Sequence, residues 1–175
     1  LVLVAGLGNR AITPDAIGPK VHENVLVTRH LIQNMPEYFG NLRPVASLAA
    51  EVMGTTGVES GELVRAVCEK LRPACVVAVD ALASRSLKRL CKTVQLADTG
   101  ITPGSGVGNH RLGLTRETLG VPVVAVGVPT VVDGATLAAD LLGADELPDL
   151  GEGHDLLVTP KDIDSQVNDL AKVIG

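Results

Sequence analysis

Aromatic side chains are almost absent from this chain of 175 residues: Tyr38 and Phe39 stand side by side, and there is no tryptophan. Base-stacking platforms and aromatic sugar-binding floors need several exposed rings, so the sequence disfavours both kinds of site. The core must be built from valine, leucine, alanine and isoleucine, which is typical of a buried parallel sheet.

Positive charge is also scarce. The chain has 15 Lys and Arg against 20 Asp and Glu, which gives a net charge of −5 and an isoelectric point near 5.3. Binding to nucleic-acid phosphates requires a basic surface. We therefore predict no direct nucleic-acid partner.

Cysteine pairs and long apolar runs are missing as well. Cys68, Cys75 and Cys91 are odd in number and show no CxxC spacing, which favours reduced, buried thiols in a cytoplasmic setting over a disulfide framework. No apolar run approaches the roughly 18 residues needed to span a bilayer. No secretory signal pattern is visible, so we expect no membrane partner.

Apolar strand-like runs alternate with amphipathic helix-like runs along the chain. This alternation predicts a single α/β domain over residues 1–175, in three layers, with helices on both faces of a mainly parallel sheet that is mixed at its edge. The expected strands are 1–5, 45–49, 75–82, 93–97 and 121–128; the expected helices are 14–33, 60–71, 134–142 and a last one that begins within 159–162 and ends at 173.

Three acidic residues fall at the carboxyl ends of the expected strands, where sheets of this kind bind their ligands. A first-turn position favoured by the helix dipole explains Asp15 as well as catalysis does. Asp80 lies near the carboxyl end of the run CVVAVDAL, after five residues of expected buried strand. A charge there is costly unless it is paired or used, so a functional role is favoured over bonding to a neighbouring loop. For Asp133, which ends TVVD, a helix N-cap is the favoured interpretation.

Two carboxylates that reach one crevice from different strands can share a proton and supply a base and an acid at the same pH. Such a pair would activate water against an amide carbonyl. The same two residues with His110 would instead hold a divalent metal such as nickel or zinc. On spacing alone, an exposed polar role is favoured for His110.

Other motifs give weak signals. The loop PGSGVGN has the backbone N–H groups to face an oxyanion or phosphate but lacks the Lys-Ser/Thr ending of a P-loop. GLGN falls short of a dinucleotide-binding GxGxxG, and Ser105 lies in no GxSxG elbow.

Several long blocks nevertheless resemble one family in order and in content. They are GLGNRAITPDAIGP, LVTRHL, VMGTTGVESGEL, VVAVDALASR, ADTGITPGSGVGN, GLTRETLGVPVVAVGVPTVVD and LLVTPKDID, and they are similar to the germination protease (spore protease) family of spore-forming bacteria. The resemblance covers most of the chain. More distantly, the chain is similar to the hydrogenase maturation endopeptidases.

The resemblance implies an atypical aspartic endopeptidase that degrades small acid-soluble spore proteins during germination, in the cytoplasm of the spore core. It also implies a zymogen, a homotetramer, no cofactor, and an N-terminal segment that precedes Leu1. The two essential aspartates of the family correspond to Asp15 and Asp80.

Further site residues are proposed beside this pair. Backbone N–H groups near Gly8 and Asn9, or in the loop around Gly106, are candidates for steadying the oxyanion. Arg85 would receive an acidic substrate side chain, although a surface ion pair explains it equally well.

Three alternatives remain beside the germination protease. One is a nickel-binding maturation endopeptidase that uses Asp15, Asp80 and His110. Another is a non-catalytic core fragment of the same fold. A peptidyl-tRNA hydrolase shares the GLGN strand but is disfavoured because the chain is acidic and lacks an NPG continuation.

Overall fold

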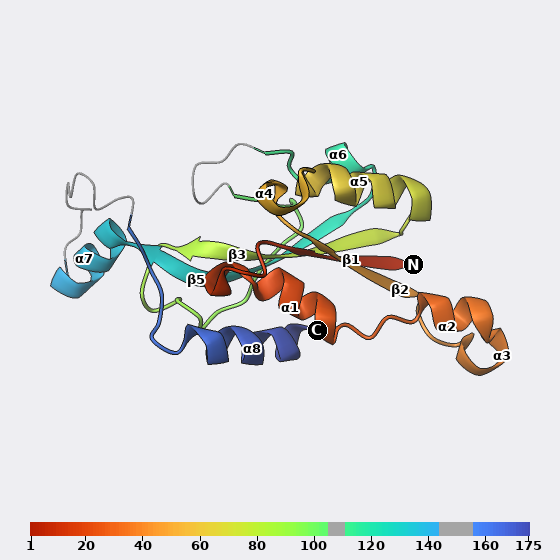
Figure 1. Ribbon diagram of the computed structural model, residues 1–175, viewed down its shortest axis with the longest axis horizontal. Coiled ribbons are helices and arrows are strands. Elements are labelled where there is room, and N and C mark those ends of the chain that lie inside the picture. Colours follow the sequence, from red (N-terminus) through yellow and green to blue (C-terminus); the bar gives the residue numbers. More distant parts are fainter. Residues whose placement is uncertain (105–110, 144–155) are drawn as a thin grey trace.

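The computed structural model describes residues 1–104, 111–143 and 156–175. In this part of the chain six strands form one sheet in the order β2-β1-β3-β5-β4, with β6 also paired to β5 (Figure 1). Strands β2, β1, β3 and β5 are parallel, whereas β4 and β6 run antiparallel to β5. The bounds are β1 (Val2–Leu7), β2 (Val45–Ala50), β3 (Cys75–Ser84), β4 (Gln95–Ala97), β5 (Val123–Asp133) and β6 (Leu157–Val158). The predicted fold class is confirmed.

Helices cover both faces of this sheet and produce the expected three layers (Figure 1). Helices α5 (Ser60–Leu71) and α6 (Arg116–Leu119) lie over one face, and α1 (Ile17–Asn24) and α8 (Ile163–Ile174) lie over the other. The remaining helices are α2 (Arg29–Asn34), α3 (Pro36–Phe39), α4 (Met53–Thr56) and α7 (Gly134–Leu142), and a 3-10 turn, η1, covers Thr13–Asp15. Among the described residues, no helix combines the length and the apolar character that a membrane crossing requires.

Two aliphatic clusters form the core, one on each face of the sheet. Leu3, Val64 and Leu114 belong to the cluster under α5, and Ile17, Val79 and Val167 belong to the cluster under α1 and α8. All three cysteines are free thiols, as predicted; Cys68 and Cys91 are buried, and Cys75 is half-buried.

The backbones of strand β1 and helix α1 are in direct contact, because glycines lie where the two elements meet. A Cβ atom added at Gly18 would lie 2.2 Å from the Leu7 carbonyl oxygen, and one at Gly6 would lie 2.1 Å from the Gly18 carbonyl oxygen. These glycines therefore hold the start of α1, and the η1 turn before it, tightly against the carboxyl end of β1.

The single helix expected over 14–33 is wrong. The helical pattern is interrupted after α1, because Thr28 is tied to the chain that leads into β2: its N–H donates to the Val45 carbonyl, and its hydroxyl donates to the Arg43 carbonyl at 2.6 Å. Helix α2 begins only at Arg29. A tertiary contact that periodicity does not reveal has overridden the helical pattern.

The last helix begins later than expected. Asp162 occupies the N-cap position of α8 without a side-chain capping bond, and the hydroxyl of Thr159 donates to the Pro160 carbonyl instead. The cap predicted within 159–162 is therefore not formed by Thr159.

Candidate active site

A cavity of about 670 Å³ opens at the carboxyl ends of β1, β3 and β5. Asp15 and Asp80 both line it, although 65 positions separate them in the sequence. Other polar and charged residues on its wall come from several elements: Ser60, Ser84, Arg85, Thr102, Arg111, Thr130 and Asp133. The structure thus brings the two predicted aspartates to one cavity.

The turn after β1 positions Asp15. Gly8 has a φ of +114°, a conformation that favours glycine, and a Cβ atom there would lie 2.1 Å from the Asp15 carbonyl oxygen. The next N–H group, of Asn9, donates to Asp15 Oδ2 at 2.7 Å. The GLGN segment therefore holds Asp15 in place. The N–H of Asn9 is hydrogen-bonded to this carboxylate and is not directed at an oxyanion.

Asp80 lies within β3 and is 6% exposed. Its Oδ1 accepts a hydrogen bond from the Ala81 N–H at 2.9 Å. Burial, together with the nearby charge of Asp15, raises the pKa of Asp80 to about 7, against the opposing effects of the Ala81 N–H and Arg111. Asp80 is therefore partly protonated at neutral pH.

The pKa of Asp15 is also raised, mainly by burial. The Asn9 N–H and the charge of Arg111 oppose this rise, and the charge of Glu51 adds to it. Because the charge of Asp15 raises the pKa of Asp80, the protonation of one group depends on that of the other. The roles of acid and base that the sequence suggested for this pair stay a prediction.

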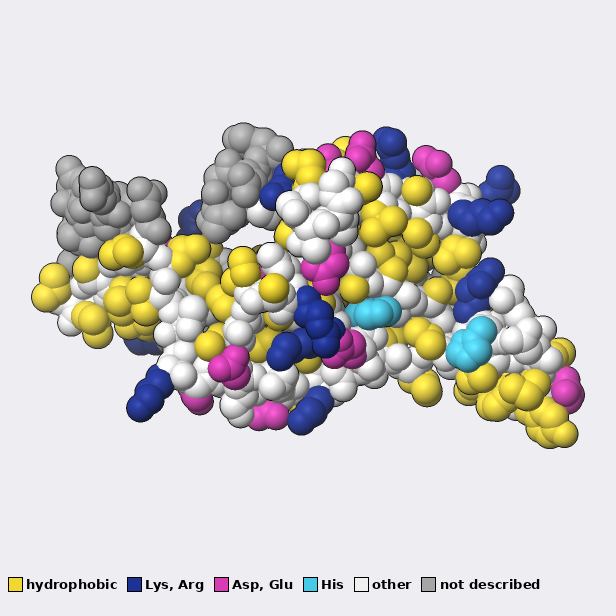
Figure 2. All heavy atoms as spheres, viewed as in Figure 1, with side chains coloured by type: hydrophobic (Ala, Val, Ile, Leu, Met, Phe, Trp, Pro, Cys, Tyr) yellow, Lys and Arg dark blue, Asp and Glu magenta, His cyan; other side chains and the backbone are white. Residues whose placement is uncertain are grey.

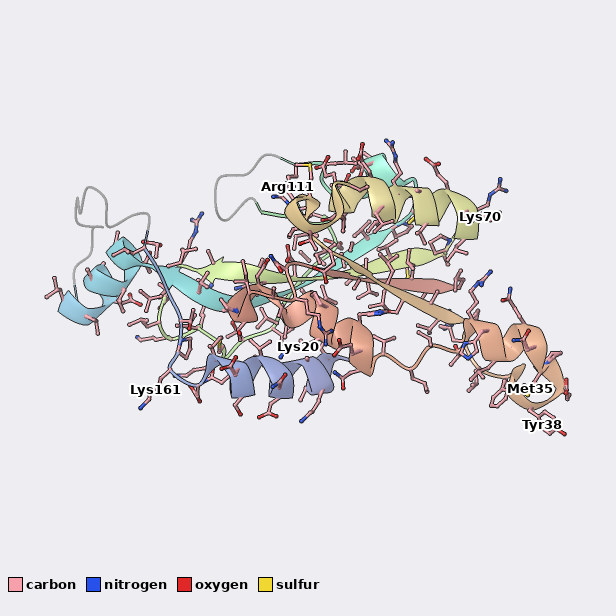
Figure 3. The ribbon with its side chains drawn as sticks, in the orientation of Figure 1. Lys20, Met35, Tyr38, Lys70, Arg111 and Lys161 are labelled. Carbon is pink, nitrogen blue, oxygen red and sulfur yellow. The ribbon has the colours of Figure 1, made fainter. Side chains whose placement is uncertain are left out.

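Arg111 is the charged residue at this site that the sequence did not reveal. It lines the cavity and lowers the pKa of both aspartates through its charge. Figure 3 shows it beside α4, on the face of the sheet covered by α5. The available signal was its position next to His110 in NHRLGL, but a loop arginine has no periodicity that would set it apart.

Asp133 lines the same cavity but serves a structural purpose. It is the N-cap of α7, and its two carboxylate oxygens accept from the Thr136 N–H at 2.8 Å and from the Thr136 hydroxyl at 2.7 Å. Burial alone would raise its pKa, but these hydrogen bonds and those from nearby N–H groups lower it. The predicted capping role of Asp133 is confirmed.

Of the remaining predicted residues, Gly8 and Arg85 lie on the cavity wall. Gly106 and His110 lie outside the described residues, so the loop contribution to an oxyanion site and the histidine of the metal hypothesis stay predictions. In the described ranges, no group of three or more His, Cys, Asp or Glu side chains has the arrangement of a metal site. Asp15 and Asp80 are the two residues there that would contribute to one.

Comparison with known sequences identifies the family. A profile described as germination protease matches residues 1–144. The chain belongs to the germination protease family. A germination protease of Clostridium perfringens is 44% identical over 99% of this chain and 63% of its own length, and that of Bacillus subtilis is 39% identical over 99% and 64%. The chain thus spans somewhat less than two thirds of these family members.

Among solved structures, the [NiFe] hydrogenase maturation protease HycI of Thermococcus kodakarensis has a similar fold. The alignment covers 99% of this chain and 88% of that one, with a TM-score of 0.52 and 20% sequence identity. At this identity the likeness concerns the fold alone. It agrees with the distant similarity to hydrogenase maturation endopeptidases that the sequence indicated.

Proposed function

We propose that this chain carries the catalytic core of an endopeptidase that degrades small acid-soluble spore proteins during germination, with Asp15 and Asp80 as the catalytic pair. One observation carries the proposal. In a member of the germination protease family, two carboxyl groups from different elements line one cavity, and burial raises the pKa of one of them to about 7.

The two aspartates have different roles in the proposed reaction: Asp15 is the general base and Asp80 is the general acid. Asp15, whose carboxylate accepts the Asn9 N–H and is near the charge of Arg111, takes a proton from water as the water oxygen bonds to the scissile carbonyl carbon. Asp80, held neutral by burial, donates its proton to the leaving amine as the C–N bond breaks. The proton on Asp15 then passes back to Asp80, and the pair returns to its starting state.

Two arginines on the cavity wall complement this pair. The positive charge of Arg111 stabilises negative charge on the pair, since it lowers the pKa of both aspartates. Arg85 has no ion-pair partner within 4 Å among the described residues, which supports a role in binding an acidic side chain of the substrate. The reaction proposed here needs no cofactor.

The family resemblance also suggests a homotetramer, a zymogen, and a location in the cytoplasm of the spore core. Exposed apolar side chains support the proposal of subunit contacts. Tyr38 on α3 is 76% exposed and Leu142 on α7 is 78% exposed. Figure 2 shows apolar surface at the ends of the molecule formed by α2–α3 and by α7, and Met35 and Tyr38 lie at the tip of the first of these in Figure 3. Large apolar patches mark surfaces that contact other proteins.

Cleavage of a purified small acid-soluble spore protein by the full-length gene product tests the function. We expect cleavage, with kcat falling as the pH rises above about 7, because Asp80 loses the proton that the leaving amine requires. Absence of cleavage would overturn the proposal. Loss of activity on chelation, restored by nickel or zinc that binds in calorimetry, would favour the metal alternative with Asp15, Asp80 and His110.

A further inference from the structure

Thr130 carries a buried hydroxyl group that has no partner. The residue lies in β5 with an exposed fraction of 0%, and no described residue forms a hydrogen bond with its Oγ1. The other buried hydroxyl groups of the described chain are hydrogen-bonded, namely those of Thr28, Ser60, Ser84 and Thr136. An unsatisfied buried hydroxyl destabilises a protein, and valine would fill the same space without that cost.

Thr130 lies at an irregularity in the pairing of β3 with β5. Leu82 of β3 pairs with Pro129 of β5, but Ala83 pairs with Val131, so Thr130 is the extra residue of a β-bulge. Bulges are enriched beside active sites, where they redirect a side chain. This one lies at the carboxyl end of β5, two residues along β3 from Asp80.

The bulge belongs to the wall of the cavity that holds the aspartate pair. Thr130, Asp15 and Asp80 all line it, and the η1 turn that carries Asp15 packs against both β3 and β5. No described residue partners the Thr130 hydroxyl, and the place of the residue on this wall makes an occupant of the cavity the candidate partner.

We propose that Thr130 is a positioning residue whose hydroxyl accepts a hydrogen bond from the water that Asp15 deprotonates. This inference rests on the proposed peptidase function. An attacking water has two O–H groups: one gives its proton to the carboxylate base, and the other needs an acceptor that fixes its orientation. A threonine hydroxyl suits that second place, because it accepts a hydrogen bond without competing for the transferred proton.

The substitution Thr130→Val tests the inference by separating activity from stability. In the full-length enzyme acting on a small acid-soluble spore protein, we expect kcat to fall about tenfold or more while KM changes little. At the same time Tm should rise by about 2–4 °C, because an unsatisfied buried hydroxyl has been removed. A residue with a merely structural role would not combine these two changes.

Two further variants complete the experiment. Thr130→Ser keeps the hydroxyl and should restore most of kcat. Thr28→Val is the matched control, since it removes a buried threonine hydroxyl that is fully hydrogen-bonded and lies outside the cavity. It should lower Tm and leave kcat unchanged, which is the opposite pattern to Thr130→Val.

The outcomes are distinguishable. If the wild-type enzyme does not cleave the spore protein, the proposed function fails and this inference fails with it. If the wild type cleaves and Thr130→Val retains its kcat, only the role of Thr130 is overturned. A serine variant as slow as the valine variant, or a fall in Tm that parallels the loss of kcat, would also overturn it.

Discussion

Two neighbouring strands, β3 and β5, place carboxylates on the same cavity wall and use them in opposite ways. Asp80 of β3 receives one backbone hydrogen bond, from Ala81, and burial raises its pKa to about 7. Asp133 of β5 is bonded through both oxygens to Thr136, and its pKa is lowered. A position on this cavity wall therefore does not make a carboxylate reactive. The burial of the carboxylate and the number of its hydrogen bonds decide whether it can exchange a proton near neutral pH.

Replacing either Asp80 or Asp133 by asparagine should give the largest difference between the two positions, and this difference is in kcat. Asp80→Asn removes the proton donor and should lower kcat on a spore protein by at least about a thousandfold. Asp133→Asn keeps an oxygen that accepts from the Thr136 N–H and should leave kcat within about twofold of wild type. Steady-state cleavage assays on the two full-length variants measure both effects. Equal losses in the two variants would contradict the division of roles.

The second largest expected difference between Asp80 and Asp133 is in how each affects the pH dependence of protein stability. The pKa of Asp80 is about 7 in the folded chain and near 3.8 when unfolded, so between these values the folded state holds a proton that the unfolded state has lost. The stabilisation from this proton is complete below about pH 4 and disappears as the pH rises through 7, with a total on the order of 4 kcal/mol. Asp133 has the opposite sign, since its pKa is lowered.

Urea unfolding at pH 5 and pH 8 tests this expectation. The wild type should lose stability between the two values, and Asp80→Asn should lose much less and be the more stable protein at pH 8. Asp133→Asn should follow the wild type. If Asp80→Asn and the wild type show the same pH dependence, Asp80 does not titrate near neutral pH in the folded state.

The contrast between these two aspartates was partly visible in the sequence. A charge near the carboxyl end of the buried run CVVAVDAL is unusual enough to indicate function, and Asp133 before a helical pattern is typical of an N-cap. Both interpretations depend on local patterns, and so do the strands and the helix 60–71, which forms α5 as expected. Periodicity and capping are properties of neighbouring residues, so sequence carries them.

Other features of the site depend on contacts between distant segments. The bulge at Thr130 arises from the register of β5 against β3, which no pattern within β5 records. Arg111 acts on Asp15 and Asp80 from a loop far along the chain. Likewise, the break after α1 follows from the hydrogen bonds of Thr28 to the segment before β2. Each of these is a tertiary interaction that overrides or supplements local preference.

The smallest expected effect concerns the capping role of Asp133 and is a change in thermal stability. Asp133→Ala removes the acceptor for the Thr136 N–H at the start of α7, and losing an N-cap costs about 1 kcal/mol. We expect Tm to fall by about 2–4 °C, while Asp133→Asn, which keeps the cap, stays close to the wild type. Thermal unfolding of the three proteins at one pH measures the difference. An alanine variant as stable as the wild type would mean that the start of α7 does not depend on this carboxylate, and the lowered pKa of Asp133 would then need another cause.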